Sequence, residues 1–155
     1  MHIRPDDLSS PAIHALLEEH LRDMHAQSPR ESVHALDLAG LRHPAISFWS
    51  AWEGEVLLGC AALRELSKDH AEIKSMRTPR ALRRRGAGRA LLERLIAVAA
   101  TRGYQRLSLE TGAQPAFAPA QQLYRQAGFA VCPPFGDYRD DPNSVFMTRL
   151  QGEQP

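Results

Sequence analysis

The sequence predicts a single α/β domain in which one mixed β-sheet carries helices on both faces. Its 155 residues fit one domain. Strand and helix patterns alternate along the second half of the chain, and a β-α-β crossover predicts two parallel strands at the centre of the sheet. Strands that flank this crossover should pair as antiparallel hairpins. We place the domain at residues 1–150 and interpret residues 151–155 as a C-terminal tail.

The composition is that of an ordinary globular protein, with 43% hydrophobic and 24% charged residues. Lys and Arg total 19 against 18 Asp and Glu, so the formal net charge is +1. This balance argues against a nucleic-acid coat or a polybasic membrane anchor. No apolar run approaches the ~20 residues of a membrane helix, and the first residues contain no hydrophobic signal core. We therefore expect a cytoplasmic protein that binds neither nucleic acid nor a membrane.

Neither the cysteines nor the histidines indicate a metal site. Cys60 and Cys132 both lie in apolar stretches, so we interpret them as reduced thiols of the core rather than as a disulfide. The seven histidines include no His-x-x-x-His or His-Glu-x-x-His pair, the spacings that place two ligands on one helix face. We expect no bound metal.

A short strand and a helix are predicted at the start of the chain. The strand covers residues 2–4. Ser10 is placed to cap a helix that has Pro11 at its first position, where proline is favoured. Apolar residues then recur at helical spacing, at Ile13, Leu16, Leu17, Leu21 and Met24. The polar segment 26–44 is expected to be a loop with one short helical piece.

Three strand patterns follow this loop. Ile46, Phe48 and Trp52 share one face of an extended segment. A turn at 53–55 leads to the almost wholly apolar run 56–63, which is typical of a strand buried on both faces. The third segment alternates, with Ala71, Ile73 and Ser75 on one side and Glu72, Lys74, Met76 and Thr78 on the other.

The remaining elements alternate between helix and strand. A helix rich in Ala, Leu and Arg is predicted over 86–102 and ends at Gly103, and a strand follows at 105–111. Another helix is predicted over 119–127, closed by Gly128. Two last strands are predicted at 129–132 and 144–150.

An arginine-rich turn with glycines separates the alternating strand from the long helix. Six arginines fall between Arg77 and Arg89, and Gly86 and Gly88 lie where the helix begins. Free N–H groups at a helix start attract anions, glycine lets the backbone approach them closely, and arginine adds charge. The turn therefore predicts a pyrophosphate site, with a solvated basic helix start as the alternative. It lacks the Gly-Lys-Ser/Thr ending of a Walker A loop, and Leu91 stands where a dinucleotide fingerprint has its third glycine.

Three blocks occur in an order that points to one family. Residues 71–78 form the strand before the turn, and residues 83–88 fit the pattern Arg-x-x-Gly-x-Gly. Residues 120–129 fit the pattern Ala-x-x-Leu-Tyr-x-x-x-Gly-Phe. With these blocks the chain resembles the GNAT superfamily of acetyl-CoA-dependent N-acetyltransferases over about residues 3 to 150. Segments 108–112 and 141–147 are similar to a bacterial subgroup of small acetyltransferases.

The resemblance implies the GNAT fold, in which the two central parallel strands splay apart and acetyl-CoA, the expected cosubstrate, lies in the gap. The pantetheine arm would pair with the backbone of Met76 and Thr78, on either side of Arg77. The side chain of Met76 would then be core and that of Arg77 surface. The pyrophosphate would meet the turn and the helix start, at Arg83, Arg84, Arg85, Gly86, Ala87, Gly88 and Arg89. The side chain of Arg89 would either contact phosphate or project into water.

The same resemblance implies the acid and base groups. Acyl transfer to an amine needs a group that takes the proton of the amine, and a proton donor helps the thiolate to leave. Tyr124 matches the family's proton donor, and an interior tyrosine is the alternative. Glu72 matches an acidic strand position and is the candidate base, on the same strand face as Met76; a surface glutamate paired with Lys74 is the alternative. Glu110 is the next candidate base, and either glutamate would otherwise bind a cationic substrate.

Fewer observations concern the acceptor. His34 lies in the loop that often covers the acceptor pocket in GNAT folds, where an ordinary loop residue is the alternative. Trp49 points away from Phe48 and Trp52 and is a candidate pocket residue, and segment 133–138 is a candidate pocket wall.

The resemblance therefore predicts an enzyme that moves an acetyl group from acetyl-CoA to a primary amine of a small molecule or a protein by direct attack in a ternary complex. The alternative is a CoA-binding module without catalysis. We expect a monomer or a homodimer, the latter formed through the strand at 144–150.

Overall fold

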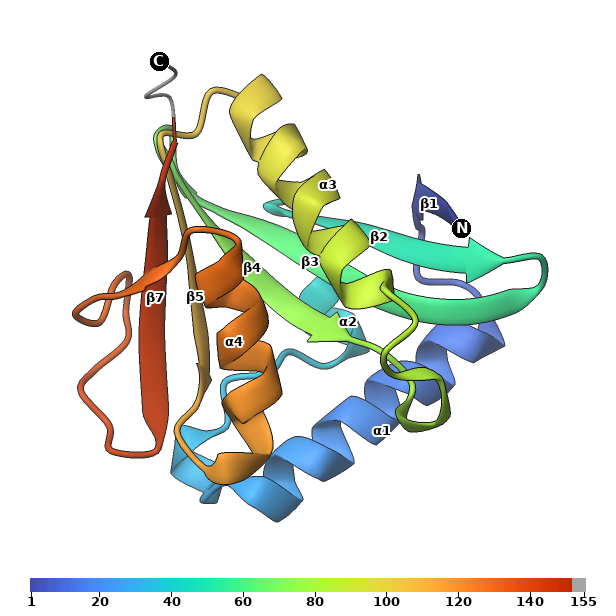
Figure 1. Cartoon of the computed structure of the whole chain (residues 1–155), viewed down its shortest axis with the longest axis horizontal. Coiled ribbons are helices and arrows are strands. Elements are labelled where there is room, and N and C mark those ends of the chain that lie inside the picture. The colour runs from blue at the N-terminus through green and yellow to red at the C-terminus, as the bar shows by residue number, and fades with distance from the viewer. Residues whose placement is uncertain (152–155) are drawn as a thin grey trace.

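One seven-stranded sheet organises the computed structural model, which describes residues 1–151 (Figure 1). The strands are β1 (His2–Pro5), β2 (Ile46–Glu53), β3 (Val56–Ser67), β4 (His70–Arg77), β5 (Arg106–Gly112), β6 (Ala130–Val131) and β7 (Ser144–Leu150). The α-helices in this part of the chain are α1 (Pro11–Gln27), α2 (Leu38–Leu41), α3 (Ala87–Thr101) and α4 (Ala118–Gln126). The strand order is β1-β2-β3-β4-β5-β7-β6. β4 and β5 pair in parallel and the other neighbours are antiparallel, so the predicted mixed sheet is confirmed.

Helices cover both faces of the sheet, as predicted (Figure 1). α3 and α4 lie on one face over a buried cluster, here called the α3 core, that includes Ile73 and Leu91. α1 and α2 lie on the other face over the α1 core, which includes Ile13 and Phe48. Trp49 belongs to the α3 core and its neighbours Phe48 and Trp52 to the α1 core, which confirms that Trp49 points the opposite way.

The N-terminal helix forms as its capping residues predict. The Ser10 hydroxyl accepts a hydrogen bond from the Ile13 N–H at 3.1 Å, which satisfies one of the free donors of the first turn. Pro11 occupies the first helical position. The loop that follows contains one 3₁₀ turn, at Arg30–Ser32, besides the one-turn helix α2.

A β-bulge interrupts β4 and corrects the predicted alternation. Lys74 lies opposite Ala62 and Arg77 opposite Cys60, so two residues of β4, Ser75 and Met76, oppose a single residue of β3. Ser75 has φ +54°, a left-handed conformation that serine rarely adopts. The extra residue turns Met76 into the α3 core, away from the face of Glu72 and Lys74. The prediction that Glu72 and Met76 share a face is therefore wrong, because alternation does not persist through a bulge.

β4 and β5 separate beyond the middle of their length. Their parallel pairing runs from His70↔Arg106 to Ile73↔Leu109 and then stops. β4 nevertheless stays paired with β3 as far as Arg77, and β5 stays paired with β7 as far as Gly112. Both strands thus continue on their outer sides while they part on the inner side, and Figure 1 shows the gap widening towards their ends. This is the predicted β-splay.

The cysteines are both free thiols, although only one of them belongs to the core. Cys60 is fully buried, and burial raises the pKa of its thiol to about 12. Cys132 follows the two-residue strand β6 and is only partly buried, so its predicted place in the core is wrong. A two-residue strand at the edge of the sheet is too short to bury the residue that follows it.

The C-terminal strand lies inside the sheet rather than at its edge. β6 pairs with Met147 and Thr148 of β7. β7 is the strand through which a dimer is predicted to form. Gln151, the first residue of the predicted tail, is buried, and its N–H donates to the Gln105 carbonyl at 2.7 Å. The rest of that tail, residues 152–155, lies outside the described residues.

Gly112, the last residue of β5, packs directly under the ring of Phe117. A Cβ at this position would lie 2.2 Å from the ring, so the ring or the strand must shift. We expect Gly112→Ala to lower the free energy of unfolding by about 1–3 kcal/mol, as overpacking of a core does. Urea denaturation measures this change. In a Phe117→Ala background the same substitution should cost much less, and an equal cost in both backgrounds would contradict the clash.

Candidate functional site

The turn between β4 and α3 leaves a row of backbone donors free. Arg84 has φ +69° and Gly86 φ +84°, so the chain passes through two left-handed residues before α3 begins at Ala87. The first N–H of this turn with an intrahelical acceptor is that of Ala90, which donates to the Gly86 carbonyl at 3.0 Å. The N–H groups of the first three helical residues therefore remain available to an anion at the positive end of the helix.

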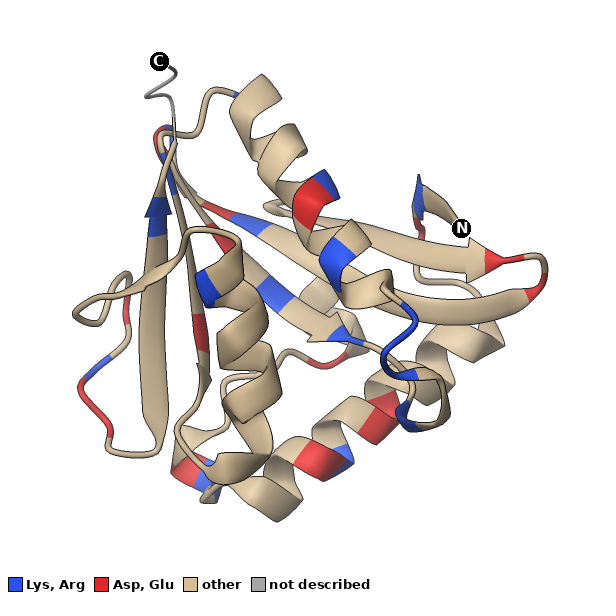
Figure 2. Cartoon of the chain, viewed as in Figure 1, with Lys and Arg blue, Asp and Glu red and all other residues tan. Residues whose placement is uncertain are grey.

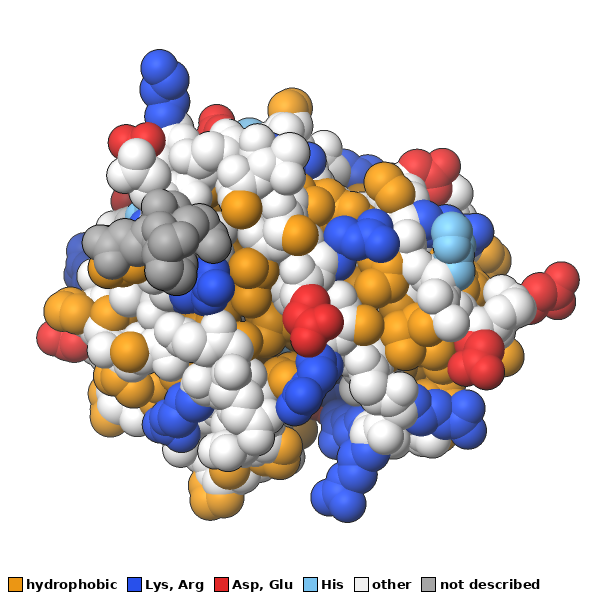
Figure 3. Space-filling view, turned by 45° about the horizontal axis from the view of Figure 1, so that its top comes forward, with side chains coloured by type: hydrophobic (Ala, Val, Ile, Leu, Met, Phe, Trp, Pro, Cys, Tyr) orange, Lys and Arg blue, Asp and Glu red, His pale blue; other side chains and the backbone are white. Residues whose placement is uncertain are grey.

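The arginines of this turn take different directions. Arg83, Arg84 and Arg85 are exposed, as an anion site requires. Arg89 is exposed as well, but its guanidinium donates to the Gln126 side chain of α4 at 2.9 Å and so links the two helices that cover this face. On the face drawn in Figure 3, Lys and Arg side chains gather towards the lower edge while acidic side chains stand singly, so the formal charge of +1 averages an uneven surface.

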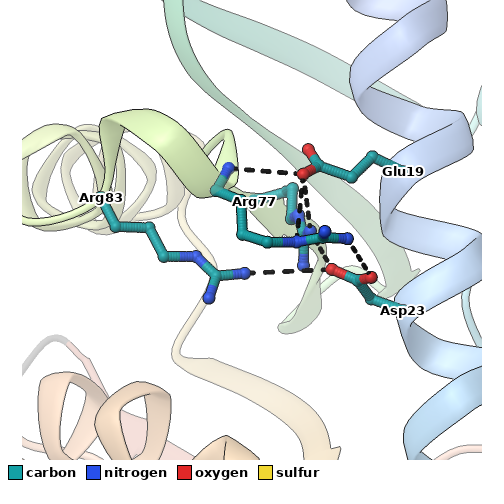
Figure 4. Close-up of polar contacts among 5 residues, drawn as sticks. Glu19, Asp23, Arg77 and Arg83 are labelled. Carbon is teal, nitrogen blue, oxygen red and sulfur yellow. Dashed lines mark hydrogen bonds and ion pairs between the residues drawn. The ribbon is translucent and has the colours of Figure 1, made fainter.

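Two carboxylates of α1 form an ion-pair cluster with this turn (Figures 2 and 4). Asp23 pairs with Arg77 and with Arg80 (2.5 Å), and Glu19 pairs with the same two guanidinium groups at 3.5 and 3.4 Å. Arg83 reaches within 4.0 Å of Asp23. Although partial burial acts in the other direction, the bonds from Arg77 and Arg80 hold the pKa of Asp23 below its ordinary value.

Arg77 is therefore not the surface side chain that the sequence predicts. Its side chain is 10% exposed and lies against α1, because the bulge at Ser75 turns it onto that face. Nearby on α1, His20 is buried, and burial together with the charge of Arg77 lowers the pKa of this imidazole to about 4. The bulged end of β4 is thus held to α1 by charge as well as by packing.

A second cluster lies on the α1 side of β4, around Glu72. This residue is 1% exposed, which excludes the surface glutamate considered above. The Tyr138 hydroxyl donates to Glu72 Oε2 at 2.5 Å. Lys74 Nζ donates to the Tyr138 hydroxyl at 2.9 Å and lies 3.4 Å from Glu72 Oε2, so the pairing of Glu72 with Lys74 does occur, but in a buried site.

Two loops far apart in the sequence meet over this cluster. Ser32, before α2, donates to the carboxylate of Asp141, before β7, at 2.5 Å. Between the loops lies a pocket of about 590 Å³ whose lining includes His34, Glu72, Lys74 and the whole of segment 136–141. The predicted pocket wall at 133–138 therefore borders this pocket through its last residues.

Glu110 and Tyr124 lie at the splay. Glu110 follows the last parallel pair of β5, and burial raises the pKa of its carboxyl to about 7, with the charges of Glu72 and Asp141 acting in the same direction. Tyr124 on α4 is buried in the α3 core, and burial together with the charge of Glu110 raises the pKa of its phenol well above the ordinary value. Glu110 is therefore near enough to this interior tyrosine for its charge to affect the phenol.

The structure brings most of the predicted residues together and leaves one apart. His34 packs edge to face on Tyr138, with ring centroids 4.9 Å apart, inside the expected pocket. Trp49 instead lies buried on β2 beneath the Arg102 guanidinium, beside a separate pocket of about 420 Å³. Tyr138 is the residue in closest contact with Glu72, but the sequence predicted it only as part of the pocket wall at 133–138. No residue spacing indicates a contact between positions 66 residues apart.

Among residues 1–151, the structure places no three His, Cys, Asp or Glu side chains close enough to hold a metal ion together. No helix in the same range is both long and apolar enough to span a membrane.

We expect the cluster of Asp23 to stabilise the fold. Asp23→Asn should lower the free energy of unfolding by about 1–2 kcal/mol at neutral pH, because two guanidinium groups then lose their charged partner. Urea denaturation at low salt tests this. The loss should shrink at 1 M salt, where such pairs are screened. Glu18→Gln, on the exposed side of the same helix, is the matched control, and an equal loss in both variants would contradict the role of the cluster.

Glu110 should make stability depend on pH. Its folded pKa lies above the ordinary value of 4.5, so the folded chain holds a proton that the unfolded chain releases, and this contribution is lost as the pH rises from about 4.5 through 7. Relative to the wild type, Glu110→Gln should therefore gain stability between pH 5 and pH 8, by about 2 kcal/mol. Denaturation of both proteins at pH 5 and at pH 8 measures the difference. The pH effect of His20 has the opposite sign, but it is the same in both proteins and therefore cancels. A constant difference would refute the shift.

Comparison with known proteins agrees with this geometry. The family model of the acetyltransferase (GNAT) family matches residues 13–129. The chain is 54% identical to the uncharacterized N-acetyltransferase YsnE of Bacillus subtilis (96% of this chain and 99% of that protein) and 50% identical to the uncharacterized N-acetyltransferase YedL of Escherichia coli (94% and 92%). A GNAT family acetyltransferase from Elizabethkingia anophelis with acetyl-CoA bound shares the fold, with a TM-score of 0.67, 17% identity and 97% coverage of both chains. The chain belongs to the GNAT family of acetyltransferases.

Proposed function

We propose that this acetyltransferase moves the acetyl group of acetyl-CoA to a primary amine by direct attack in a ternary complex. The observation that carries the proposal is the splay between β4 and β5, which has a basic helix start on one side and a buried carboxylate on the other. The relatives named N-acetyltransferases match over almost their full length, so the alternative of a CoA-binding module without catalysis is not supported. Because both cysteines are free thiols, we place the enzyme in the cytoplasm.

The residues of the splay fit acetyl-CoA. Among residues 1–151, the inner edge of β4 faces no strand beyond Ile73, so the backbone at Met76 and Thr78 can pair with the amides of the pantetheine arm, as an added strand would. The free N–H groups of the helix start suit the pyrophosphate. The exposed side chains of the turn add positive charge, and the residues that we assign to this anion are Arg83, Arg84, Arg85, Gly86, Ala87, Gly88 and Arg89.

We assign the proton transfers to two groups on opposite faces of the sheet. As the amine nitrogen attacks the thioester carbonyl, a C–N bond forms and the nitrogen loses a proton, for which Glu72 is the base. When the C–S bond breaks, the thiolate takes a proton from Tyr124. The raised pKa of Tyr124 keeps this donor protonated at neutral pH.

Glu110 remains the second candidate for the base. Its pKa of about 7 means that it changes charge in the range where a general base works best. The alternative role, recognition of a cationic part of the acceptor, uses the same carboxylate in its ionised form. His34 lies in the acceptor pocket and is proposed to contact the acceptor, whereas the position of Trp49 gives it no part in this site.

Release of free thiol from acetyl-CoA tests the proposal. We choose four primary amines that differ in charge and size: benzylamine, spermidine, L-lysine and a peptide with a free N-terminus. The wild type should release thiol with at least one of them. Binding of acetyl-CoA without thiol release from any of the four would contradict the proposed function.

Tyr124→Phe should lower kcat by about tenfold or more and leave the affinity for acetyl-CoA nearly unchanged, because only the donated proton is removed. Calorimetric titration with CoA separates the two effects. Turnover equal to that of the wild type would refute Tyr124 as the acid.

A further inference from the structure

Glu72 lines the acceptor pocket but offers it almost no accessible surface. The residue is 1% exposed, and the Tyr138 hydroxyl covers Oε2 at 2.5 Å. A general base must lie within hydrogen-bond reach of the proton that it takes, or reach it through one intervening group. Tyr138 touches Glu72, is half-buried and lines the same pocket, so it is placed to connect an amine there with the carboxylate.

The hydrogen bonds of Tyr138 leave one position open. Its hydroxyl donates its single proton to Glu72, and its oxygen accepts one hydrogen bond from Lys74 Nζ at 2.9 Å. A phenolic oxygen has two lone pairs, so it can accept one more hydrogen bond. An amine in the pocket can supply that bond.

We propose that Tyr138 is a catalytic residue that relays the proton of the acceptor amine to Glu72. This inference rests on the proposed function, with Glu72 as the base. As the C–N bond forms, the nitrogen gives its proton to Tyr138 Oη while the hydroxyl proton of Tyr138 passes to Glu72 Oε2. The tyrosine is unchanged at the end, and Glu72 carries the proton. Acetyl-CoA supplies the leaving thiolate, so no other reactant is needed.

The surroundings of Tyr138 suit a relay. Its ring is held by Phe135 and Phe146, with centroids 5.2 and 5.4 Å away, and by His34 at 4.9 Å, so the direction of the hydroxyl is fixed. The ammonium of Lys74 lies where it can stabilise negative charge on Oη during the transfer. Burial and the charge of Glu72 raise the pKa of Tyr138, which keeps the relay proton in place before reaction.

Another tyrosine provides a matched control. The Tyr104 hydroxyl also donates to a glutamate, Glu65, at 2.5 Å, but Tyr104 belongs to the α3 core. Tyr104→Phe removes a hydrogen bond of the same kind without touching Glu72. Because Glu65 also lines the pocket, a loss of activity in Tyr138→Phe that is absent in Tyr104→Phe is specific to the hydrogen bond with Glu72.

The experiment compares kcat/KM of the wild type, Glu72→Gln, Tyr138→Phe, the double variant and Tyr104→Phe, with whichever of the four named amines the wild type acetylates fastest. We expect Glu72→Gln to lose about 100-fold or more, and Tyr138→Phe to lose about 10- to 100-fold. Because both residues lie on one proton path, the double variant should fall no more than about twofold below Glu72→Gln. Tyr104→Phe should stay within about twofold of the wild type, and KM for acetyl-CoA should hardly change in any variant.

Each other outcome has a distinct meaning. Tyr138→Phe at or above the wild-type rate, with Glu72→Gln impaired, overturns the relay and leaves Glu72 as the base. Losses that multiply in the double variant also overturn it, because they indicate independent roles. An unimpaired Glu72→Gln contradicts the proposed base, and with it the relay. Thermal denaturation of Tyr138→Phe, which keeps the ring and its packing, shows whether a loss comes from misfolding.

Discussion

The inner edge of β4 is the constraint on which the rest of the structure depends. Backbone N–H and C=O groups are obligatory hydrogen-bonding groups, and a strand in the middle of a sheet normally pairs on both sides. Within residues 1–151, β4 has a strand partner on the β5 side only as far as Ile73. The groups beyond this point face a gap that a ligand with its own amides can fill.

The bulge at Ser75 arranges the two faces of β4 around this edge. By adding one residue it sends Met76 to the α3 core and Arg77 to α1, where Glu19 and Asp23 neutralise its charge. It leaves Glu72 on the α1 face, under the loop of Tyr138. The donors proposed for the cofactor and the proposed acid–base groups thus lie around one break in the sheet, while the elements that hold them remain paired on their outer sides.

The sequence predicted the parts of this arrangement that depend on local patterns. The cap at Ser10, the glycine at the start of α3 and the tyrosine of α4 each carry their signal within a few residues, and the parallel pair of β4 and β5 follows from the β-α-β crossover. The bulge was missed because the alternation of 71–78 looks regular, and only the partner strand reveals the extra residue. The ion pairs of Arg77 and the contact between Glu72 and Tyr138 were missed for a related reason. They join elements distant in the sequence, and charge alone does not say which partner a side chain finds.

Amide hydrogen exchange with and without acetyl-CoA tests the central claim most directly, namely that the free edge of β4 and the start of α3 hold the cofactor. We expect slower exchange on binding at the amides of Met76 and Thr78 and at those of Ala87, Gly88 and Arg89. Amides on the outer side of β7 should exchange as before. Protection that appears elsewhere while these five amides exchange at an unchanged rate would contradict the account.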